Sequence, residues 1–563
     1  MIWYYKLLNL GAILFCLIFI RYNWYRLKYF LQVFQQLGYK HNEYWQWLKE
    51  NWDTKVIPSS LATLNVLIFL MLWFDEWVYE HLTITSVSVF FFILSSYWFG
   101  SIKVYKADKV KKPLVFTPRV IRLTIPFVLG VALFPGFFSW LSFSGMIPYY
   151  QIPLPNYYAG LLSFDLLLLT FGWAFGTILV PFLLFVASFL TRPVERYIQR
   201  GFKKQARRKL ESMPELKVVA ITGSYGKTST KFMLRDLLKE RFNVCSTPGS
   251  YNTPMGICKV INNDLEANHQ VLILEMGARY EGNIQELCDI AQPDIAVITN
   301  VGVAHLETFG SKEVIATEKG TLVDNLLDGG VAVLNADDEL VRLMGNNRPD
   351  IERIMTGLNE GEIRGSEISY DTSGMQFQVE INGNSETFKT KLLGAHNVQN
   401  LLLAIGVAHH FGIRLKTMAL AASRIEPVEH RLELKRNGDL IVIDDAFNSN
   451  PVGARNAVEI LGQFNSGNRI IITPGMIELG DIEYEENRKF GEAIARASLD
   501  LVILVGEERA QPILKGIEVA NGEMQNVQVV NSLFEANDLV KEHASSGDII
   551  LYENDLPDVY NEE

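Results

Sequence analysis

The feature that most constrains this chain is a run of apolar and β-branched residues at 217–222, followed by a glycine loop and a helical pattern. The loop reads Gly223-Ser-Tyr-Gly-Lys-Thr228. A strand, a glycine turn and a helix N-terminus together aim backbone N–H groups at a phosphate. We therefore predict nucleotide binding, with Lys227 on the outer phosphates and the Thr228 hydroxyl in a Mg²⁺ shell. Because the loop is shorter than the general phosphate-loop pattern, this motif alone leaves an ordinary glycine turn open.

Two further side chains follow strand-like runs. Glu275 ends the apolar run 271–274, and His305 follows the run 295–299 and its turn. Open α/β sheets bind ligands where their strands end, and a carboxylate there is a reasonable Mg²⁺ ligand. The alternatives are a buried ion pair for Glu275 and a structural histidine for His305.

Several ordered segments resemble the Mur ligase family of ATP-dependent ligases, and most closely its D-alanyl-D-alanine-adding branch. The resemblance covers about residues 215–510. The matching segments begin with Thr222-Gly-Ser-Tyr-Gly-Lys-Thr-Ser229 and continue with Asn252, Glu275-Met-Gly-Ala278, Thr299 to Glu307, Lys319, Asn335-Ala-Asp-Asp338, Gly394 to Asn400, Arg431, Asp445 to Pro451 and Gly475 to Gly480. The resemblance implies the family's central ATP-binding α/β domain and its C-terminal Rossmann-like domain, with ATP and Mg²⁺ as cofactors.

The resemblance also implies roles for individual residues. The catalytic set is Lys227, Glu275, His305, Lys319 and Arg431. The nucleotide site comprises Gly223, Ser224, Tyr225, Gly226, Lys227, Thr228, Ser229, Asn397, Asn400, Arg431 and Asp445. The metal set is Thr228, Glu275, His305 and Lys319, in which Lys319 is carbamylated by CO₂ and becomes a metal ligand.

Each of the later assignments has a plainer alternative. The charged helical context of Lys319 also fits a solvent-exposed face. Asn397 and Asn400 lie three residues apart on one helix face, where they would contact adenine or cap the helix. Arg431 and Asp445 would reach ATP when the domains close, or form surface ion pairs.

The implied reaction is attack of a carboxylate on the γ-phosphate, followed by displacement of phosphate by an amine. Two departures from the family bear on the substrate. Its N-terminal UDP-sugar-binding domain has no visible counterpart, and acidic residues (Glu553, Asp555, Asp558) replace a Lys-Gly-Ser-Arg stretch near the acceptor. We therefore expect a peptide or muropeptide carboxylate presented at the membrane, either lipid-linked or part of a growing polymer, and an amino acid or dipeptide acceptor.

The first 210 residues differ in composition from the rest. They hold 22 Lys+Arg against 9 Asp+Glu, whereas the remainder holds 30 against 54. About 20 apolar residues span a bilayer, and candidate stretches lie at 4–20, 57–74, 82–100, 121–141 and 158–190. Three basic loops fall on one side of five spans, which predicts a multi-pass protein of the cell membrane with cytoplasmic ligase domains and membrane lipids as partners.

These observations give four predicted segments: a transmembrane region of about five helices at 1–191, a basic linker at 192–212, a central ATP-binding domain at 213–422 and a C-terminal domain at 423–563. The expected fold class is a helical transmembrane region followed by α/β domains. The four scattered cysteines predict reduced thiols, and nothing indicates nucleic-acid binding. Two alternatives to a peptidoglycan ligase remain open: a membrane-bound poly-amino-acid (poly-γ-glutamate-like) synthetase, and a nucleotide-switched transporter or sensor.

Overall fold

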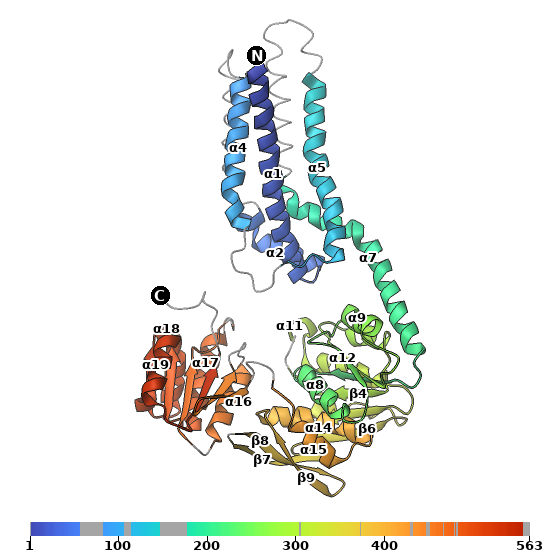
Figure 1. The fold of residues 1–563 in the computed structure, drawn as a ribbon, viewed down its shortest axis with the longest axis vertical. Helices are drawn as coiled ribbons and strands as arrows, with labels where there is room; N and C mark the ends of the chain where they lie inside the picture. The colour runs from blue at the N-terminus through green and yellow to red at the C-terminus, as the bar shows by residue number, and fades with distance from the viewer. Residues whose placement is uncertain are drawn as a thin grey trace. The chain divides into compact units, whose positions relative to one another are not determined.

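The computed structural model describes residues 2–56, 83–105, 114–146, 177–302, 306–371, 373–427, 432–445, 451–464, 467–477, 479 and 482–554. The chain divides into two compact units, Met1–Gln199 and Arg200–Glu563. The first unit is helical and the second is built on two β-sheets (Figure 1).

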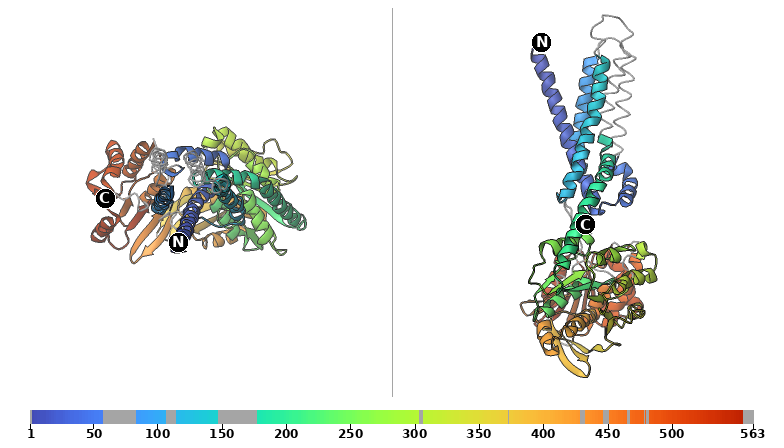
Figure 2. Two further views of the ribbon diagram at one scale, coloured as in Figure 1. Left: turned by 90° about the horizontal axis from the view of Figure 1, so that it is seen from above. Right: turned by 90° about the vertical axis from the view of Figure 1, so that its right-hand side faces the viewer.

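The first unit contains long helices whose axes are roughly aligned (Figure 2). Its described elements are α1 (Ile2–Gln36), α2 (His41–Glu50), the π-helix η1 (Trp52–Val56), α4 (Thr83–Tyr105), α5 (Pro118–Met146) and α7 (Val180–Glu211), which continues into the second unit. Aromatic rings fill the core, where Trp98 lies 5.1 Å from both Phe15 and Phe19. The fully buried Arg26 donates to the Tyr105 hydroxyl and the Val56 carbonyl and so ties α1 to α4 and η1.

The prediction of a multi-pass membrane protein is wrong. Across the part of the chain that the structure describes, no helix combines the length and the apolar character needed to cross a bilayer. In α7 the described apolar portion runs only from residue 180 to 190 before Thr191, Arg192 and Pro193. The predicted span 57–74 and most of 158–190 lie outside the described residues, and those at 4–20, 82–100 and 121–141 fall in α1, α4 and α5. The outer faces of these helices nevertheless expose apolar side chains such as Leu17, Phe92 and Leu133.

The larger sheet of the second unit has the strand order β2-β3-β1-β4-β5-β6-β7-β8-β9. Strands β1 to β7 pair in parallel, and β7, β8 and β9 form an antiparallel meander. The strands are β1 (Lys217–Thr222), β2 (Val244–Ser246), β3 (Val271–Glu275), β4 (Ile295–Ile298), β5 (Val331–Asn335), β6 (Glu352–Gly357), β7 (Ile363–Asp371), β8 (Gly374–Ile381) and β9 (Asn384–Thr390).

Helices cover both faces of this sheet. Along β1, Val219 and Ile221 join the core that includes α8, whereas Val218 and Ala220 face the other core. The helices are α8 (Lys227–Leu238), α9 (Pro254–Asn263), α10 (Asn283–Cys288), α11 (Leu306–Phe309), α12 (Lys312–Asp324), α13 (Glu339–Arg342), α14 (Ala395–His410) and α15 (Leu415–Ala422). Since β3 and β4 flank β1 on opposite sides, the chain reverses its strand order at β1, which is where open α/β sheets form a ligand crevice.

The smaller sheet has the order β10-β11-β15-β12-β13-β14, and all its pairs except β10–β11 are parallel. Its strands are β10 (Glu433–Asn437), β11 (Leu440–Asp445), β12 (Arg469–Thr473), β13 (Leu501–Val505), β14 (Val527–Val530) and β15 (Ile549–Glu553). Its helices are α16 (Pro451–Gly462), α17 (Glu483–Ala497), α18 (Glu507–Val519), the 3₁₀ turn η4 (Met524–Asn526) and α19 (Leu533–His543). The α/β fold predicted for both parts of this unit is confirmed.

All four cysteines are free. Cys245, Cys258 and Cys288 lie in the core of the larger sheet. Burial raises the pKa of Cys245 and Cys258 to about 11 and that of Cys288 to about 12. These thiols are therefore protonated near neutral pH.

Candidate functional site

The loop between β1 and α8 has a backbone that only glycine fits at two positions. Gly223 has φ 152° and Gly226 has φ 79°. A Cβ added to Gly223 would lie 1.8 Å from Thr299 Oγ1, and one added to Gly226 would lie 2.3 Å from Asn400 Oδ1. The loop thus passes close to the end of β4 and to α14, and opens at the N-terminus of α8.

Residues after β4 hold this loop in shape. The Ser224 amide donates to the Asn300 carbonyl at 3.0 Å, and the Gly302 amide donates to Ser224 Oγ at 2.8 Å. Thr299 Oγ1 donates to the Tyr225 carbonyl at 2.6 Å. These hydrogen bonds fix the shape of the loop backbone, as a pre-organised anion site requires.

Lys227 lies at the first position of α8 and folds back over the loop. Its Nζ donates to the carbonyls of Gly223 at 2.7 Å and Ser224 at 3.2 Å. Burial lowers the pKa of Lys227, and the nearby Glu275 carboxylate opposes this shift. Ser229 lies half-buried in the same first turn. The ammonium group is thus held at the mouth of the phosphate loop.

Glu275 ends β3 beside the phosphate loop and is 1% exposed. Thr228 Oγ1 donates to its Oε2 at 2.9 Å, and Asn252 Nδ2 donates to its Oε1 at 3.1 Å. A hydroxyl and a carboxylate are oxygen ligands of the kind Mg²⁺ prefers. Thr228 and Glu275, two of the four predicted metal ligands, therefore lie together and fit a Mg²⁺ ion.

The sequence interpretation missed Lys231, whose Nζ lies 3.2 Å from Glu275 Oε2. The side chain of Lys231 is 0% exposed. The available signal was its spacing: residues three apart share a helix face, so Lys231 lies on the face of Thr228.

Lys319 lies on α12 and is 4% exposed, so the alternative of a solvent-exposed face is wrong. Burial and the positive charge of Lys227 lower the pKa of Lys319 to about 7, against the opposing effect of Glu318. Glu318 itself accepts from the Gly282 and Ile284 amides at 2.8 and 2.7 Å. Lys319 is thus a buried amine that is largely neutral at mildly alkaline pH.

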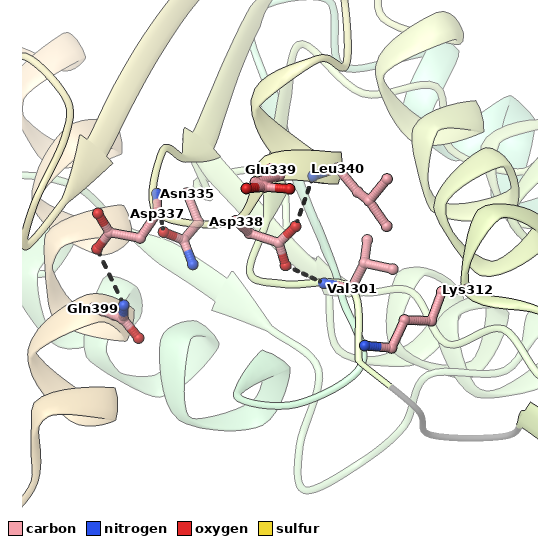
Figure 3. A pocket seen from close by; sticks show the side chains of 8 residues that line it. All are labelled: Val301, Lys312, Asn335, Asp337, Asp338, Glu339, Leu340 and Gln399. Carbon is pink, nitrogen blue, oxygen red and sulfur yellow. Dashed lines mark hydrogen bonds between the residues drawn. The ribbon is translucent and has the colours of Figure 1, made fainter.

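A pocket of about 380 Å³ opens at the ends of β4 and β5 (Figure 3). Its lining is mostly polar, includes three acidic residues, and consists of Val301, Lys312, Asn335, Asp337, Asp338, Glu339, Leu340 and Gln399. Asp338 Oδ2 accepts from the Val301 amide at 2.7 Å, and Gln399 Nε2 donates to Asp337 Oδ2 at 3.2 Å. The first residues of α14 thereby border both the pocket and the loop.

The two predicted adenine contacts lie on α14 in different surroundings. Asn400 is 6% exposed and packs against Gly226. Asn397 Nδ2 donates to the Leu393 carbonyl at 2.8 Å, which ties the first turn of α14 to the backbone that precedes the helix. The structure therefore brings Asn400 to the phosphate loop, whereas the Asn397 side chain binds a backbone carbonyl.

Of the remaining predicted residues, the structure describes only Asp445. His305 and Arg431 lie outside the described residues. Asp445 ends β11 in the smaller sheet, where its Oδ1 accepts from the Leu432 amide at 3.1 Å. Among the described residues there is no group of three or more His, Cys, Asp or Glu side chains that would hold a metal.

Comparison with known proteins identifies this architecture. The Mur ligase middle domain matches residues 221–408, and the Mur ligase glutamate ligase domain matches residues 430–552. A UDP-N-acetylmuramoyl-tripeptide–D-alanyl-D-alanine ligase from Bacillus subtilis is 31% identical over 343 residues, which cover 60% of this chain and 72% of that protein. The chain belongs to the Mur ligase family. Mur ligases are ATP-dependent amide ligases that use ATP and Mg²⁺, and this Mur ligase is such an enzyme.

Other relatives agree with the assignment. The Mycobacterium tuberculosis ligase of the same name is 35% identical over 306 residues, which cover 52% of this chain and 59% of that protein. MurF from Acinetobacter baumannii superposes with a TM-score of 0.54 at 27% identity, covering 63% of this chain and 77% of that structure. MurF ligase from Thermotoga maritima in complex with ADP gives the same TM-score and identity, with 63% and 80% covered. These comparisons support a peptidoglycan ligase and lend no support to a poly-amino-acid synthetase or a transporter.

Proposed function

We propose that this Mur ligase joins the carboxylate of a UDP-linked muropeptide to D-alanyl-D-alanine in peptidoglycan synthesis. The observation that carries the proposal is the meeting of the phosphate loop, Lys227 and the Thr228–Glu275 pair at the reversal point of the sheet. The substrates named for the relatives supply the donor and the acceptor. Residues 213–422 would form the ATP-binding domain and residues 423–563 the C-terminal domain.

The reaction needs charge neutralisation more than covalent chemistry. The substrate carboxylate attacks the γ-phosphate of ATP, releasing ADP and leaving an acyl phosphate. The acceptor amine then attacks the acyl carbon, phosphate leaves and an amide forms. Mg²⁺ held by Thr228 and Glu275 would neutralise the phosphate oxygens. Lys227 would offset charge on the transferred group, because its ammonium already lies at the loop.

Other predicted residues would complete the site. We assign Asn400, which approaches Gly226 of the phosphate loop, and the polar pocket lined by its neighbour Gln399 to the nucleoside end of ATP. Lys319 would contribute a carbamate to the metal site, and His305, Arg431 and Asp445 would join when substrates bind.

The test is ligation by the purified full-length protein with Mg²⁺-ATP, UDP-N-acetylmuramoyl-tripeptide and D-alanyl-D-alanine, followed by phosphate release and product mass. Lys227→Ala should abolish the amide product, and Lys239→Ala, an exposed lysine just after the same helix, should retain it. Parallel reactions with glutamate as the acceptor or a lipid-linked muropeptide as the donor test the other substrates. Amide formation only from one of those would contradict the proposed substrates, and ATP binding without any amide would contradict the ligase.

A further inference from the structure

Lys231 is a buried lysine that the phosphate-loop chemistry leaves without a role. Its side chain is 0% exposed, and its Nζ contacts two acceptors from different segments. One is Glu275 Oε2, at 3.2 Å, and the other is the carbonyl of Gly249. Lys231 therefore joins the end of β3 to the loop that follows β2.

Glu275 is held from several directions at once. Its Oε2 accepts from Thr228 and Lys231, and its Oε1 accepts from Asn252. Its backbone amide donates to Thr247 Oγ1 at 3.3 Å. With both carboxylate oxygens and the backbone fixed, the carboxylate has one orientation.

The loop at residues 247–252 closes this arrangement around the carboxylate. Lys231 contacts the loop at Gly249, and the loop returns Asn252 to the other oxygen of Glu275. The Tyr251 amide donates to the Pro248 carbonyl at 3.2 Å, and the Gly277 amide donates to the Asn252 carbonyl at 3.0 Å. The loop is thus tied to itself and to the residues after β3.

A buried ion pair is a poor source of stability, because the cost of removing both charges from water offsets their attraction. A lysine that only balanced the charge of Glu275 would also need no hydrogen bond besides the one to the carboxylate. Lys231 also donates a hydrogen bond to the uncharged Gly249 carbonyl, in the loop that carries Asn252. This geometry favours an orienting role over charge compensation alone.

We propose that Lys231 is a positioning residue of the metal site, which together with the 247–252 loop holds the Glu275 carboxylate ready for the divalent cation that accompanies ATP. The inference rests on the proposed function, since it assumes that Glu275 is a metal ligand. It adds that metal affinity depends on a lysine that touches neither the metal nor the substrate.

The test is Mn²⁺ binding to the full-length protein with ADP, measured by electron paramagnetic resonance. ADP affinity in EDTA, measured with a fluorescent analogue, reports the phosphate loop alone. Loss of a side chain that orients a metal ligand weakens metal binding about 10–100-fold. Lys231→Gln should therefore weaken Mn²⁺ binding at least tenfold and leave ADP affinity in EDTA unchanged. Lys239→Gln, the exposed lysine just after the same helix, should alter neither.

Unchanged or tighter Mn²⁺ binding by folded Lys231→Gln would overturn the proposal, because a mere counter-ion repels the metal. If Lys231→Gln does not fold, Mn²⁺ binding by Asn252→Ser tests the proposal instead. This variant loses the contact with Oε1 and leaves no unpaired charge, so weaker Mn²⁺ binding supports the closed arrangement and unchanged binding overturns it. Failure of the wild type to bind Mn²⁺ with ADP would instead count against the proposed function.

Discussion

At the scale of single residues, the position of Gly226 makes two demands that only glycine meets. Its φ of 79° and the 2.3 Å approach of Asn400 Oδ1 to an added Cβ both exclude a side chain. A left-handed conformation costs a residue with a Cβ about 1–2 kcal/mol. We expect Gly226→Ala to lower the free energy of unfolding by at least that amount and to weaken ADP binding at least tenfold, measured by denaturation and calorimetric titration.

Gly282 is the matched control for this prediction. It also occupies the N-cap of a helix, with φ 83°, but nothing lies within 4 Å of an added Cβ. Gly282→Ala should carry the backbone cost without the loss of ADP affinity. Equal ADP affinity in the two variants would show that the contact with Asn400 has no bearing on the nucleotide.

Lys319 carries a second residue-scale prediction. Only a neutral amine attacks CO₂, and a pKa of about 7 leaves Lys319 largely neutral at pH 8. We expect a carbamate signal in carbon-13 NMR after incubation with labelled bicarbonate, and its decline as the pH falls below about 7 and the amine is protonated. Lys319→Gln should lose the signal and about 10²–10³-fold of the ligation rate.

Lys239→Gln should keep both the carbamate signal and the rate, since Lys239 is exposed after α8. A carbamate signal of equal size in Lys319→Gln would place the modification on another amine and remove Lys319 from the metal site.

At the scale of elements, Asp337 joins the end of β5 to the turn after β6 and to α14. It accepts from the amides of Leu358, Asn359 and Glu360 at 2.7, 3.0 and 3.1 Å, besides Gln399. Burial alone would raise the pKa of Asp337, but these hydrogen bonds outweigh it and lower the pKa. The Asp337 carboxylate therefore stabilises the folded protein fully at a pH above the ordinary aspartate pKa. This stabilisation is lost as the pH falls through the lower pKa that Asp337 has in the folded protein.

We expect Asp337→Asn to reduce the free energy of unfolding by about 1–3 kcal/mol at pH 7. The difference from wild type should shrink below about pH 4, as measured by urea denaturation across pH. Asp264→Asn, at the exposed end of α9, should show neither effect. A difference that is constant with pH would contradict the role assigned to the charge.

Local patterns predicted the elements that carry the site. The strand expected at 217–222 and the apolar run ending at Glu275 are confirmed as β1 and β3, and the helix after the loop is α8. The contact of Lys231 with Gly249 was not predicted because it depends on how the loop after β2 folds back toward α8. No local pattern of charge or hydrophobicity predicts the path of that loop.

At the scale of the whole molecule, apolar composition predicts bilayer spans in the N-terminal region, and this prediction is wrong. Aromatic side chains such as Trp98 and Phe15 instead fill a core between helices. Composition alone does not separate a helix that packs on its neighbours from one that crosses a membrane, because both need apolar surface.

The boundary between the two units supports a prediction about truncation. Residues 202–209 of α7 belong by their contacts to the second unit: Lys203 pairs with Glu286, and Lys209 and Phe202 bond to Asn262. We expect a fragment of residues 200–563 to fold and bind Mn²⁺ and ADP. A fragment of residues 214–563 should melt lower by about 2–4 °C for each kcal/mol lost, as measured by calorimetry. Identical melting of the two fragments would show that this part of α7 contributes nothing to the unit.

The protonation state of the cysteines makes the enzyme a convenient subject for site-specific spectroscopy. Maleimide dyes react with thiolates, and the buried thiols of Cys245, Cys258 and Cys288 hold their protons well above neutral pH. Cys16 is exposed, so replacing it by serine would silence the native background. A fluorophore pair on two introduced cysteines, one in each sheet-based part of the second unit, would then measure the distance between the two parts with and without ATP.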